Sequence, residues 1–148
     1  MLQLYLLGQL VLAITLGGIL GAQREYRGRQ AGFRTYALVC AGASLFTAVC
    51  VNFFGPTYQA SANVAAQIVT GVGFLGAGMI LHKENRIEGL TTAAGLWAVA
   101  AIGMVVGVRY FVLAIGATLF IFLVLAIDDR RFHPKVKERD AIIENKNE

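Results

Sequence analysis

Charged residues are few in this chain, and they are missing where an ion pathway would use them. Asp, Glu, Lys and Arg make up 15% of the 148 residues, whereas a soluble domain usually carries about 25%. None of the nine acidic residues falls in the middle of a long apolar run. Proton relays in membranes use buried acids or histidine, and magnesium prefers oxygen ligands such as carboxylates. The sequence therefore argues against a proton-coupled pump and weakens an ion-transport interpretation.

Cysteine and histidine are equally sparse, with two residues of each type. Cys40 and Cys50 share one apolar run, and at about 100° per residue they fall on different faces of a helix. We expect small packed side chains there, not a disulfide or a metal pair. His82 and His133 lack the spacing of paired ligands, and nothing resembles a nucleophile with its base. We therefore predict no enzyme activity, no cofactor and no metal site.

Apolar residues, in contrast, are abundant and contiguous. They make up 57% of the chain, and the mean hydropathy is +0.63. Five apolar runs cover residues 2–22, 35–54, 62–81, 91–108 and 110–127. Each is near the roughly 20 residues that a helix needs to cross a bilayer, and isolated strands cannot satisfy their backbone in lipid. We predict an all-α membrane protein with five transmembrane helices in a domain covering 1–127, followed by a short charged tail, 128–148.

The positions of the basic residues predict the orientation. Of the 13 Lys and Arg residues, all except Arg109 fall in 23–34, 82–90 or the tail. Positive charge beside spanning helices is held on the cytoplasmic side, so we expect a bacterial inner-membrane protein with a periplasmic N-terminus and a cytoplasmic C-terminus. No basic residue precedes the first run, so we expect no cleavable signal peptide. Nucleic-acid binding would need a soluble basic face, and we expect none.

A faint repeat relates the two halves of the apolar region. Leu-Gly-Ala occurs at 20–22 and again at 75–77, and a Gly-x-x-Thr element occurs at 32–35 and 89–92. Each copy would be a helix, a cytoplasmic loop and a second helix. Duplicated membrane folds of this kind pack around an axis along the membrane normal. The candidate architecture is a duplicated helix–loop–helix pair plus one extra helix, with both basic loops close together.

Glycines are spaced for contact between helices. Gly17/Gly21 and Gly103/Gly107 are G-x-x-x-G pairs, which bring helix backbones together in lipid. The G-x-G-x-x-G run at 71–76 is not a dinucleotide fingerprint, because no strand precedes it. Two interpretations stay open for the third apolar run: packing, or a broken helix that lines a pathway. The residues concerned are Gln67, Thr70, Gly71, Gly73, Gly76 and Gly78.

The first basic loop is a candidate anion or partner site. Its residues are Arg24, Glu25, Arg27, Arg29, Arg34 and Thr35, joined by Thr92 after the second loop. Thr35 or a residue near it is the expected N-cap of the second helix. Amides at a helix start attract anions, and arginine forks bind phosphate or carboxylate. The alternative is topology control together with contact to lipid phosphates.

Three stretches in order, 24–35, 66–80 and 89–97, resemble the MgtC/SapB family of bacterial inner-membrane proteins. The resemblance implies a role in adaptation to low magnesium, acid or survival within host cells. Family members are described as magnesium transporters or as regulators that bind membrane ATPases. They commonly carry an acidic residue at the position of Gln23, so no role for that carboxylate is carried over. Many also have a soluble ACT-like C-terminal domain, which we expect this chain to lack.

The residues themselves favour a regulator over a transporter. The glycine-lined helices predict association with a second copy, with another inner-membrane protein, or with both, while the basic loop would contact membrane lipid or an anion. The alternative is a small magnesium or other ion transporter or channel, with its path along the third apolar run.

Overall fold

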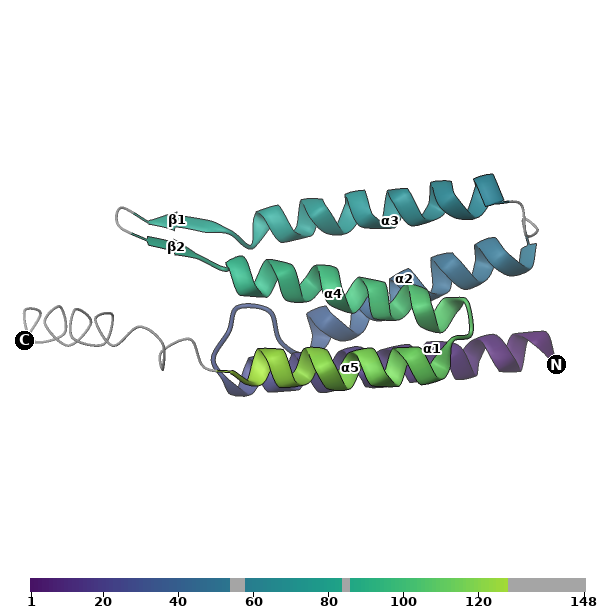
Figure 1. Ribbon diagram of the computed structural model, residues 1–148, viewed down its shortest axis with the longest axis horizontal. Helices are drawn as coiled ribbons and strands as arrows, with labels where there is room; N and C mark the ends of the chain where they lie inside the picture. Colours follow the sequence, from purple (N-terminus) through teal and green to yellow (C-terminus); the bar gives the residue numbers. More distant parts are fainter. Residues whose placement is uncertain (54–57, 84–85, 128–148) are drawn as a thin grey trace, which may run out of the picture.

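Five helices make up most of the fold. The computed structural model describes residues 1–53, 58–83 and 86–127. In chain order the elements are α1 (Leu2–Tyr26), α2 (Phe33–Phe53), α3 (Tyr58–Gly78), β1 (Leu81–Lys83), β2 (Arg86–Glu88), α4 (Leu90–Gly107) and α5 (Phe111–Ala126). The helices lie side by side along roughly one direction (Figure 1). The all-α prediction is confirmed, apart from the short hairpin. The predicted tail, 128–148, lies outside the described residues.

Helix length and hydropathy bear on the predicted spans. Within the described residues, three helices, α1, α2 and α4, are long and apolar enough to cross a membrane. Helix α5 is apolar but has only 16 residues. Helix α3 has 21 residues, but it carries the amides Asn63 and Gln67 and is not among the three. The structure therefore supports a protein with several membrane-spanning helices, while five crossings stay a prediction.

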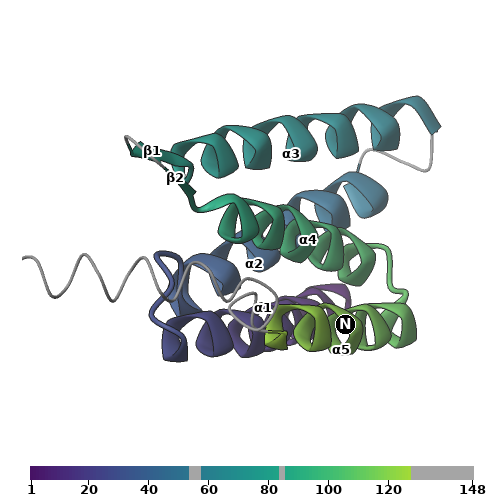
Figure 2. The same ribbon diagram turned by 60° about the vertical axis from the view of Figure 1, so that its left-hand side comes forward.

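Helix α2 is central, with α1 packed on one side and α4 on another (Figure 2). A β-carbon added to Gly17 would lie 2.6 Å from Cβ of Cys40, and one added to Gly107 would lie 2.6 Å from Cβ of Thr47. The other glycine of each pair is equally crowded by α2. Glycine therefore lets the backbones approach closely, as G-x-x-x-G pairs do in lipid. The predicted helix contacts are confirmed, and they are made within one chain.

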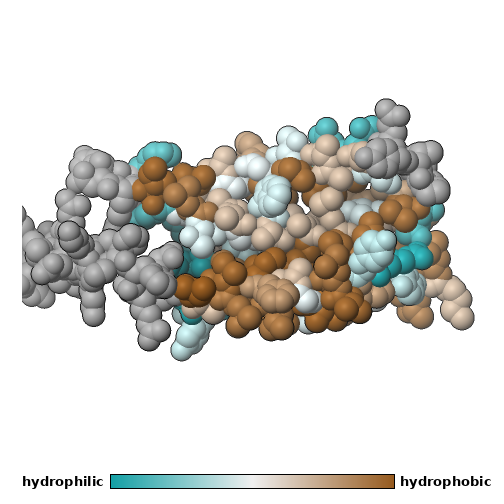
Figure 3. All heavy atoms as spheres, viewed as in Figure 1, coloured by the Kyte–Doolittle hydropathy of each residue, from teal (hydrophilic) through white to brown (hydrophobic). Residues whose placement is uncertain are grey.

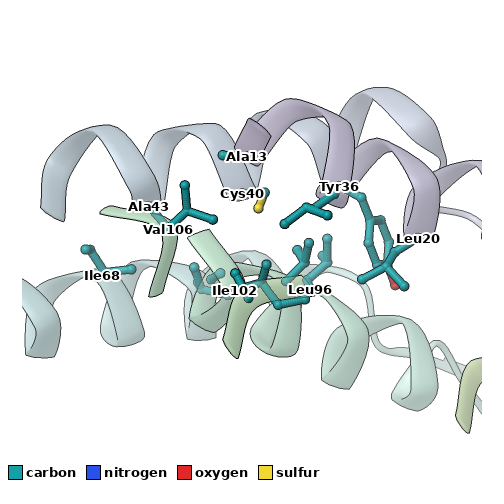
Figure 4. Packing of buried hydrophobic residues seen from close by; sticks show 14 of the residues in the cluster. Ala13, Leu20, Tyr36, Cys40, Ala43, Ile68, Leu96, Ile102 and Val106 are labelled. Carbon is teal, nitrogen blue, oxygen red and sulfur yellow. The ribbon is translucent and has the colours of Figure 1, made fainter. Parts of the chain in front are cut away.

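Buried side chains form one cluster between these helices. Leu20, Tyr36, Leu96 and Val99 are at most 1% exposed. Figure 4 shows Leu20, Tyr36 and Leu96 pointing into the space between α1, α2 and α4. Because lipid tails are as apolar as these side chains, close van der Waals packing is the main force that holds such a cluster together. Both cysteines are free and buried, as expected for small packed side chains.

The outer surface of the bundle is apolar as well. Large side chains such as Phe46, Phe74, Val112 and Phe120 are between 66% and 88% exposed. Figure 3 shows hydrophobic residues over the middle of the bundle, with hydrophilic residues gathered toward its ends. Large contiguous apolar patches mark surfaces that contact a membrane or another protein. This surface agrees with a bundle that is embedded in lipid.

The connections between helices fall at two opposite ends. The loop 27–32, the β1–β2 hairpin and the end of α5 lie together at what we call the basic end (Figure 1). The N-terminus and the α4–α5 turn lie at the other end. There Arg109, with a φ of 72°, donates from Nη2 to Oδ1 of Asn52 at 2.7 Å and lies over the Tyr5 ring. The structure thus separates the basic connections from Arg109, as the topology prediction requires.

Three local predictions are wrong. The expected loop 82–90 contains a hairpin in which Leu81 pairs with Glu88, because α3 ends earlier than predicted and the extended segments that follow satisfy each other's backbone groups. Thr35 does not cap α2, since the helix already begins at Phe33. Helix α3 is continuous through 71–78, so the broken-helix interpretation fails. A continuous helix keeps its backbone hydrogen bonds, which lipid cannot replace.

Candidate functional site

Arg24 is the buried arginine of the basic end. It lies in the last turn of α1 and is 3% exposed. Its Nη2 donates to Oγ1 of Thr92 at 3.2 Å, whereas its Nε is buried without a hydrogen-bond partner. Buried polar groups are normally hydrogen-bonded, and leaving a charged donor unmatched is costly. Arg24 therefore has an unused donor that a further acceptor can satisfy.

The first turn of α4 lies beside Arg24. Gly89 precedes the helix with a φ of 91°, and no side chain caps the helix start. The first intrahelical bond runs from the amide of Ala93 to the carbonyl of Gly89 at 2.8 Å. The amides of residues 90–92 therefore have no acceptor within the helix, and the partial positive charge of a helix start gathers there.

Tyr36 fixes the position of this helix start. The ring is fully buried in α2, and its hydroxyl donates to the backbone carbonyl of Thr92 at 3.4 Å. Gly95 makes room for the ring, because a β-carbon at that position would overlap the Tyr36 hydroxyl. Thr92 therefore receives one hydrogen bond from α1 and one from α2, and the three helices meet at this residue.

A hollow of about 530 Å³ opens beside these groups, and we call it the basic-end hollow. Arg24, Arg29 and Gln30 line it from α1 and the following loop, Glu88 lines it from β2, and residues 89–92 line it from the start of α4. Arg29 is exposed and lies close enough to Arg24 for the two positive charges to repel each other. Of the predicted anion-site residues, the structure brings Arg24, Arg29 and Thr92 together here.

Glu25 and Arg27 are used by the fold itself. Oε2 of Glu25 accepts from the backbone amide of Phe33 at 2.8 Å, at the start of α2. Nη2 of Arg27 donates to the carbonyl of Ala126 at 2.6 Å, at the end of α5. A carboxylate at a helix start and a cation at a helix end both compensate the unpaired backbone groups there. Glu25 therefore takes the place that an external anion would occupy on α2.

Arg34 and Thr35 lie apart from these groups. Both are exposed in the first turn of α2, and neither lines the basic-end hollow. Because Thr35 is inside the helix, its side chain is not at the capping position where serine and threonine satisfy free amides. The candidate site therefore contains fewer residues than the loop sequence predicts, because Arg34 and Thr35 lie outside it.

The second predicted region, on α3, lines a groove. About 710 Å³ open between α2 and α3, lined mainly by apolar side chains together with Asn63, Gln67, Gly42 and Gly71. We call this the α2–α3 groove. In the described part of the chain, the amides of Asn63 and Gln67 make no hydrogen bond. The groove therefore combines an apolar lining with two unmatched amides.

The α3 glycines differ in their surroundings. A β-carbon added to Gly71, Gly73 or Gly78 would meet nothing within 4 Å, whereas one added to Gly76 would lie 3.6 Å from Cβ of Ala93. Thr70 donates its hydroxyl to the Ala66 carbonyl of its own helix at 2.9 Å. Gly76 therefore packs against α4, while the other three glycines present an open backbone.

The sequence profile of the MgtC family matches residues 10–132. The chain belongs to the MgtC family. "Putative magnesium transporter YhiD" of Escherichia coli K12 is 42% identical over 125 residues, which cover 80% of this chain and 58% of YhiD. "Protein MgtC" of Salmonella typhimurium LT2 is 43% identical over 112 residues, which cover 76% of this chain and 47% of that protein. The predicted resemblance is confirmed.

A third relative, an uncharacterized protein of Haemophilus influenzae, is 35% identical over 147 residues, covering 92% of this chain and 62% of that protein. The MgtC-family chain described here thus spans about half to three fifths of the length of these relatives. No solved structure matches it significantly.

Gln23 stands where the resemblance implies an acidic residue. Its Nε2 donates to the carbonyl of Phe122 in α5 at 3.2 Å, and its Oε1 is buried without a partner. A carboxylate has no hydrogen to donate and would face that carbonyl with a second acceptor. In this MgtC-family chain the position therefore connects α1 to α5.

Apart from Arg24, the polar side chains that the described helices bury are amides and hydroxyls. The sequence analysis missed Gln9, which is 3% exposed and donates from Nε2 to the carbonyl of Val106 at 2.8 Å. The signal that could have found it is an amide in the interior of a long apolar run. Thr118 donates its hydroxyl to the Ala114 carbonyl of its own helix at 2.8 Å. Within the described ranges, no group of three or more His, Cys, Asp or Glu residues is placed to hold a metal ion.

Proposed function

We propose that this chain is a non-enzymatic regulator of other inner-membrane proteins, such as ATPases and transporters, in adaptation to low magnesium, acid or intracellular stress. It acts by binding a transmembrane helix of its partner in the α2–α3 groove. All five helices cross the bilayer in this proposal, with the basic end in the cytoplasm. A short helix such as α5 is accommodated by local thinning of the bilayer.

The groove is the observation that carries the proposal. Open glycines let another helix backbone approach closely, and amide side chains hydrogen-bond across helices in lipid. Gly42 and Gly71 are open in this way, and Asn63 and Gln67 line the same groove. Lipid tails cannot accept or donate hydrogen bonds, so amides that face them lose the bonds that water would give. A partner helix with small residues can approach the open glycines closely, and a polar group on that helix can hydrogen-bond the two amides.

The other glycine-lined contacts are not available to a partner. Gly17, Gly21, Gly103 and Gly107 are filled by α2 of the same chain. Helix α3 packs at the edge of the bundle, where it leaves α2 partly uncovered (Figures 1 and 2). The sequence predicted association through all of the glycine-lined helices. With four of these glycines already packed on α2, the surface left for a partner is the open face of α3 and the part of α2 beside it.

Filling the groove tests the proposal. Gly71→Leu places a side chain in the α2–α3 groove. Gly116→Leu is the matched control. A β-carbon at Gly116 also meets nothing within 4 Å, but Gly116 lies on α5, away from the groove. A photo-crosslinking amino acid at the position of Phe46, an exposed lining residue of the groove, should form adducts with a membrane protein in living cells. Gly71→Leu should abolish these adducts and impair growth at low magnesium, while Gly116→Leu should change neither.

A magnesium transporter is the second candidate, favoured by the name of the relative YhiD. Liposomes that hold only the purified chain separate the two functions. Magnesium flux that needs no partner and is blocked by Gly71→Leu would establish transport and overturn the regulator. Wild-type growth of Gly71→Leu cells together with unchanged adducts would also contradict helix binding in the groove.

A further inference from the structure

We infer that the basic-end hollow binds a phosphate group, held by the guanidinium groups of Arg24 and Arg29 and by the backbone amides at the start of α4. The site lies at the basic end and shares no lining residue with the α2–α3 groove. It therefore goes beyond the proposed function and is tested separately from it.

The buried guanidinium of Arg24 points to a ligand. The residue lines the hollow and is 3% exposed, yet its Nε has no acceptor. Its Nη2 already uses the Thr92 hydroxyl at 3.2 Å. A hydroxyl that accepts from a guanidinium still has its own hydrogen to donate. An oxyanion in the hollow can therefore accept from this hydroxyl, which Arg24 positions.

The two helix starts at the basic end are treated differently. On α2, the Glu25 carboxylate accepts from the amide of Phe33 at 2.8 Å, so the chain supplies its own anion. On α4, no side chain caps the helix, and residues 89–92 line the hollow. Free amides at a helix start together with the helix dipole form a site for phosphate. The uncapped start is the one that faces the buried arginine.

Charge in the hollow favours a single compact anion. Arg24 and Arg29 lie within Coulombic range of each other, and an anion between two guanidinium groups relieves their repulsion. Arginine is suited to phosphate because it presents a planar fork of donors. Glu88, which has an interaction of its own, also lines the hollow. The two guanidinium groups are the charges that would face a ligand, so we assign one phosphate group to the site.

The phosphate group can come from an anionic lipid headgroup or from a soluble phosphate, and two probes separate these sources. The full chain is purified in dodecyl maltoside, a detergent without phosphate. Inorganic phosphate is titrated by calorimetry, and phosphatidylglycerol is titrated by native mass spectrometry. Saturable binding of inorganic phosphate identifies a soluble ligand. Binding of phosphatidylglycerol alone identifies the lipid headgroup.

Two exposed arginines give a matched pair of variants. Arg29→Ala removes a hollow residue, and Arg34→Ala removes an arginine of α2 that lies outside the hollow. We expect Arg29→Ala to weaken binding of the effective probe roughly tenfold to a hundredfold, as for a lost hydrogen bond to a charged group. Arg34→Ala should leave the affinity unchanged. Because both side chains are exposed, neither variant should impair folding.

Arg24→Lys tests the fork itself. Lysine keeps the positive charge but loses the Nε donor and the planar geometry. We expect weaker binding of the effective probe by a variant that circular dichroism shows to be folded. If the role of Arg24 were purely structural, a folded Arg24→Lys variant would keep the affinity of the wild type. Absence of saturable binding by either probe would overturn the inference. Equal losses in Arg29→Ala and Arg34→Ala would overturn it too, because they would show attraction by overall charge alone.

Discussion

Replacing Gly17 with alanine puts a methyl group where α1 and α2 leave no room for one. The added carbon would lie 2.6 Å from Cβ of Cys40, 2.7 Å from the Tyr36 carbonyl oxygen and 3.2 Å from Cα of Ala37. Two of these three neighbours are backbone atoms, so a change of side-chain rotamer cannot relieve the contact. Ordinary contact begins at 3.4 Å. The helices must therefore separate by about 0.8 Å, the difference between 3.4 and 2.6 Å, along a contact that depends on close packing.

The size of the effect follows from comparison with Gly116→Ala. A methyl group at Gly116 meets nothing within 4 Å, and both glycines lie inside helices. Exchanging glycine for alanine in a helix interior contributes about 1 kcal/mol of stability, a term that both variants share. Their difference therefore isolates the overpacking cost, which is about 1–3 kcal/mol.

Unfolding in mixed micelles of dodecyl maltoside and SDS, followed by circular dichroism, measures both variants against the wild type. We expect Gly116→Ala to be as stable as the wild type or more stable, and Gly17→Ala to be less stable than Gly116→Ala by about 1–3 kcal/mol. Equal stability of the two variants would refute the reasoning, because it would show that α1 and α2 can separate without loss of packing energy.

Two further substitutions test how the helix ends at the basic end are held. Glu25→Ala removes the carboxylate that accepts from the Phe33 amide, and we expect a loss of about 0.5–2 kcal/mol in the same assay; unchanged stability would contradict the capping role. Gln23→Glu replaces the donor to the Phe122 carbonyl with an acceptor, and we expect a loss of about 1–3 kcal/mol at neutral pH. A Gln23→Glu variant as stable as the wild type would show that this hydrogen bond does not hold α1 to α5.

Helix packing was predictable where glycine spacing and helical periodicity agree. The pairs at Gly17/Gly21 and Gly103/Gly107 are four residues apart, so both members of each pair fall on one face. Helix α3 also carries a pair of small residues four apart, Gly73 and Ala77, yet a β-carbon added to Gly73 meets nothing within 4 Å. Spacing shows that a face is smooth, but it does not show which helix lies opposite. For that reason the sequence alone could not distinguish the two interpretations of the third apolar run, packing and a pathway.

The candidate duplication gains support from one pair of contacts, although it stays a prediction. Gly21 packs against Tyr36, and Gly76 packs against Ala93. The shared elements of the two halves align Gly21 with Gly76 and Tyr36 with Ala93. The first contact is tighter, because a β-carbon on Gly21 would lie 2.8 Å from its neighbour, compared with 3.6 Å for Gly76. This difference accounts for the more open position of α3.

The chemistry of the proposed anion site follows from the loop sequence, but its residues could not be chosen from the sequence. Four arginines lie within eleven residues, 24–34, and composition does not distinguish them. The fold buries Arg24, assigns Arg27 to the end of α5 and leaves Arg34 on the surface. These roles depend on how the last turn of α1 is oriented toward α4 and α5, which is set by tertiary packing. The hairpin was missed for a related reason, since a polar segment of a few residues has no strong strand pattern.

The hydrogen bond between Arg27 and the carbonyl of Ala126 has a mechanical consequence. It ties the last residue of α5 to the loop that carries Arg29, although the two lie 99 residues apart in the chain. A displacement of the end of α5 would therefore act on Arg27 and, through it, on the loop that carries Arg29. A domain or protein attached after Ala126 would be coupled to the basic-end hollow by this contact.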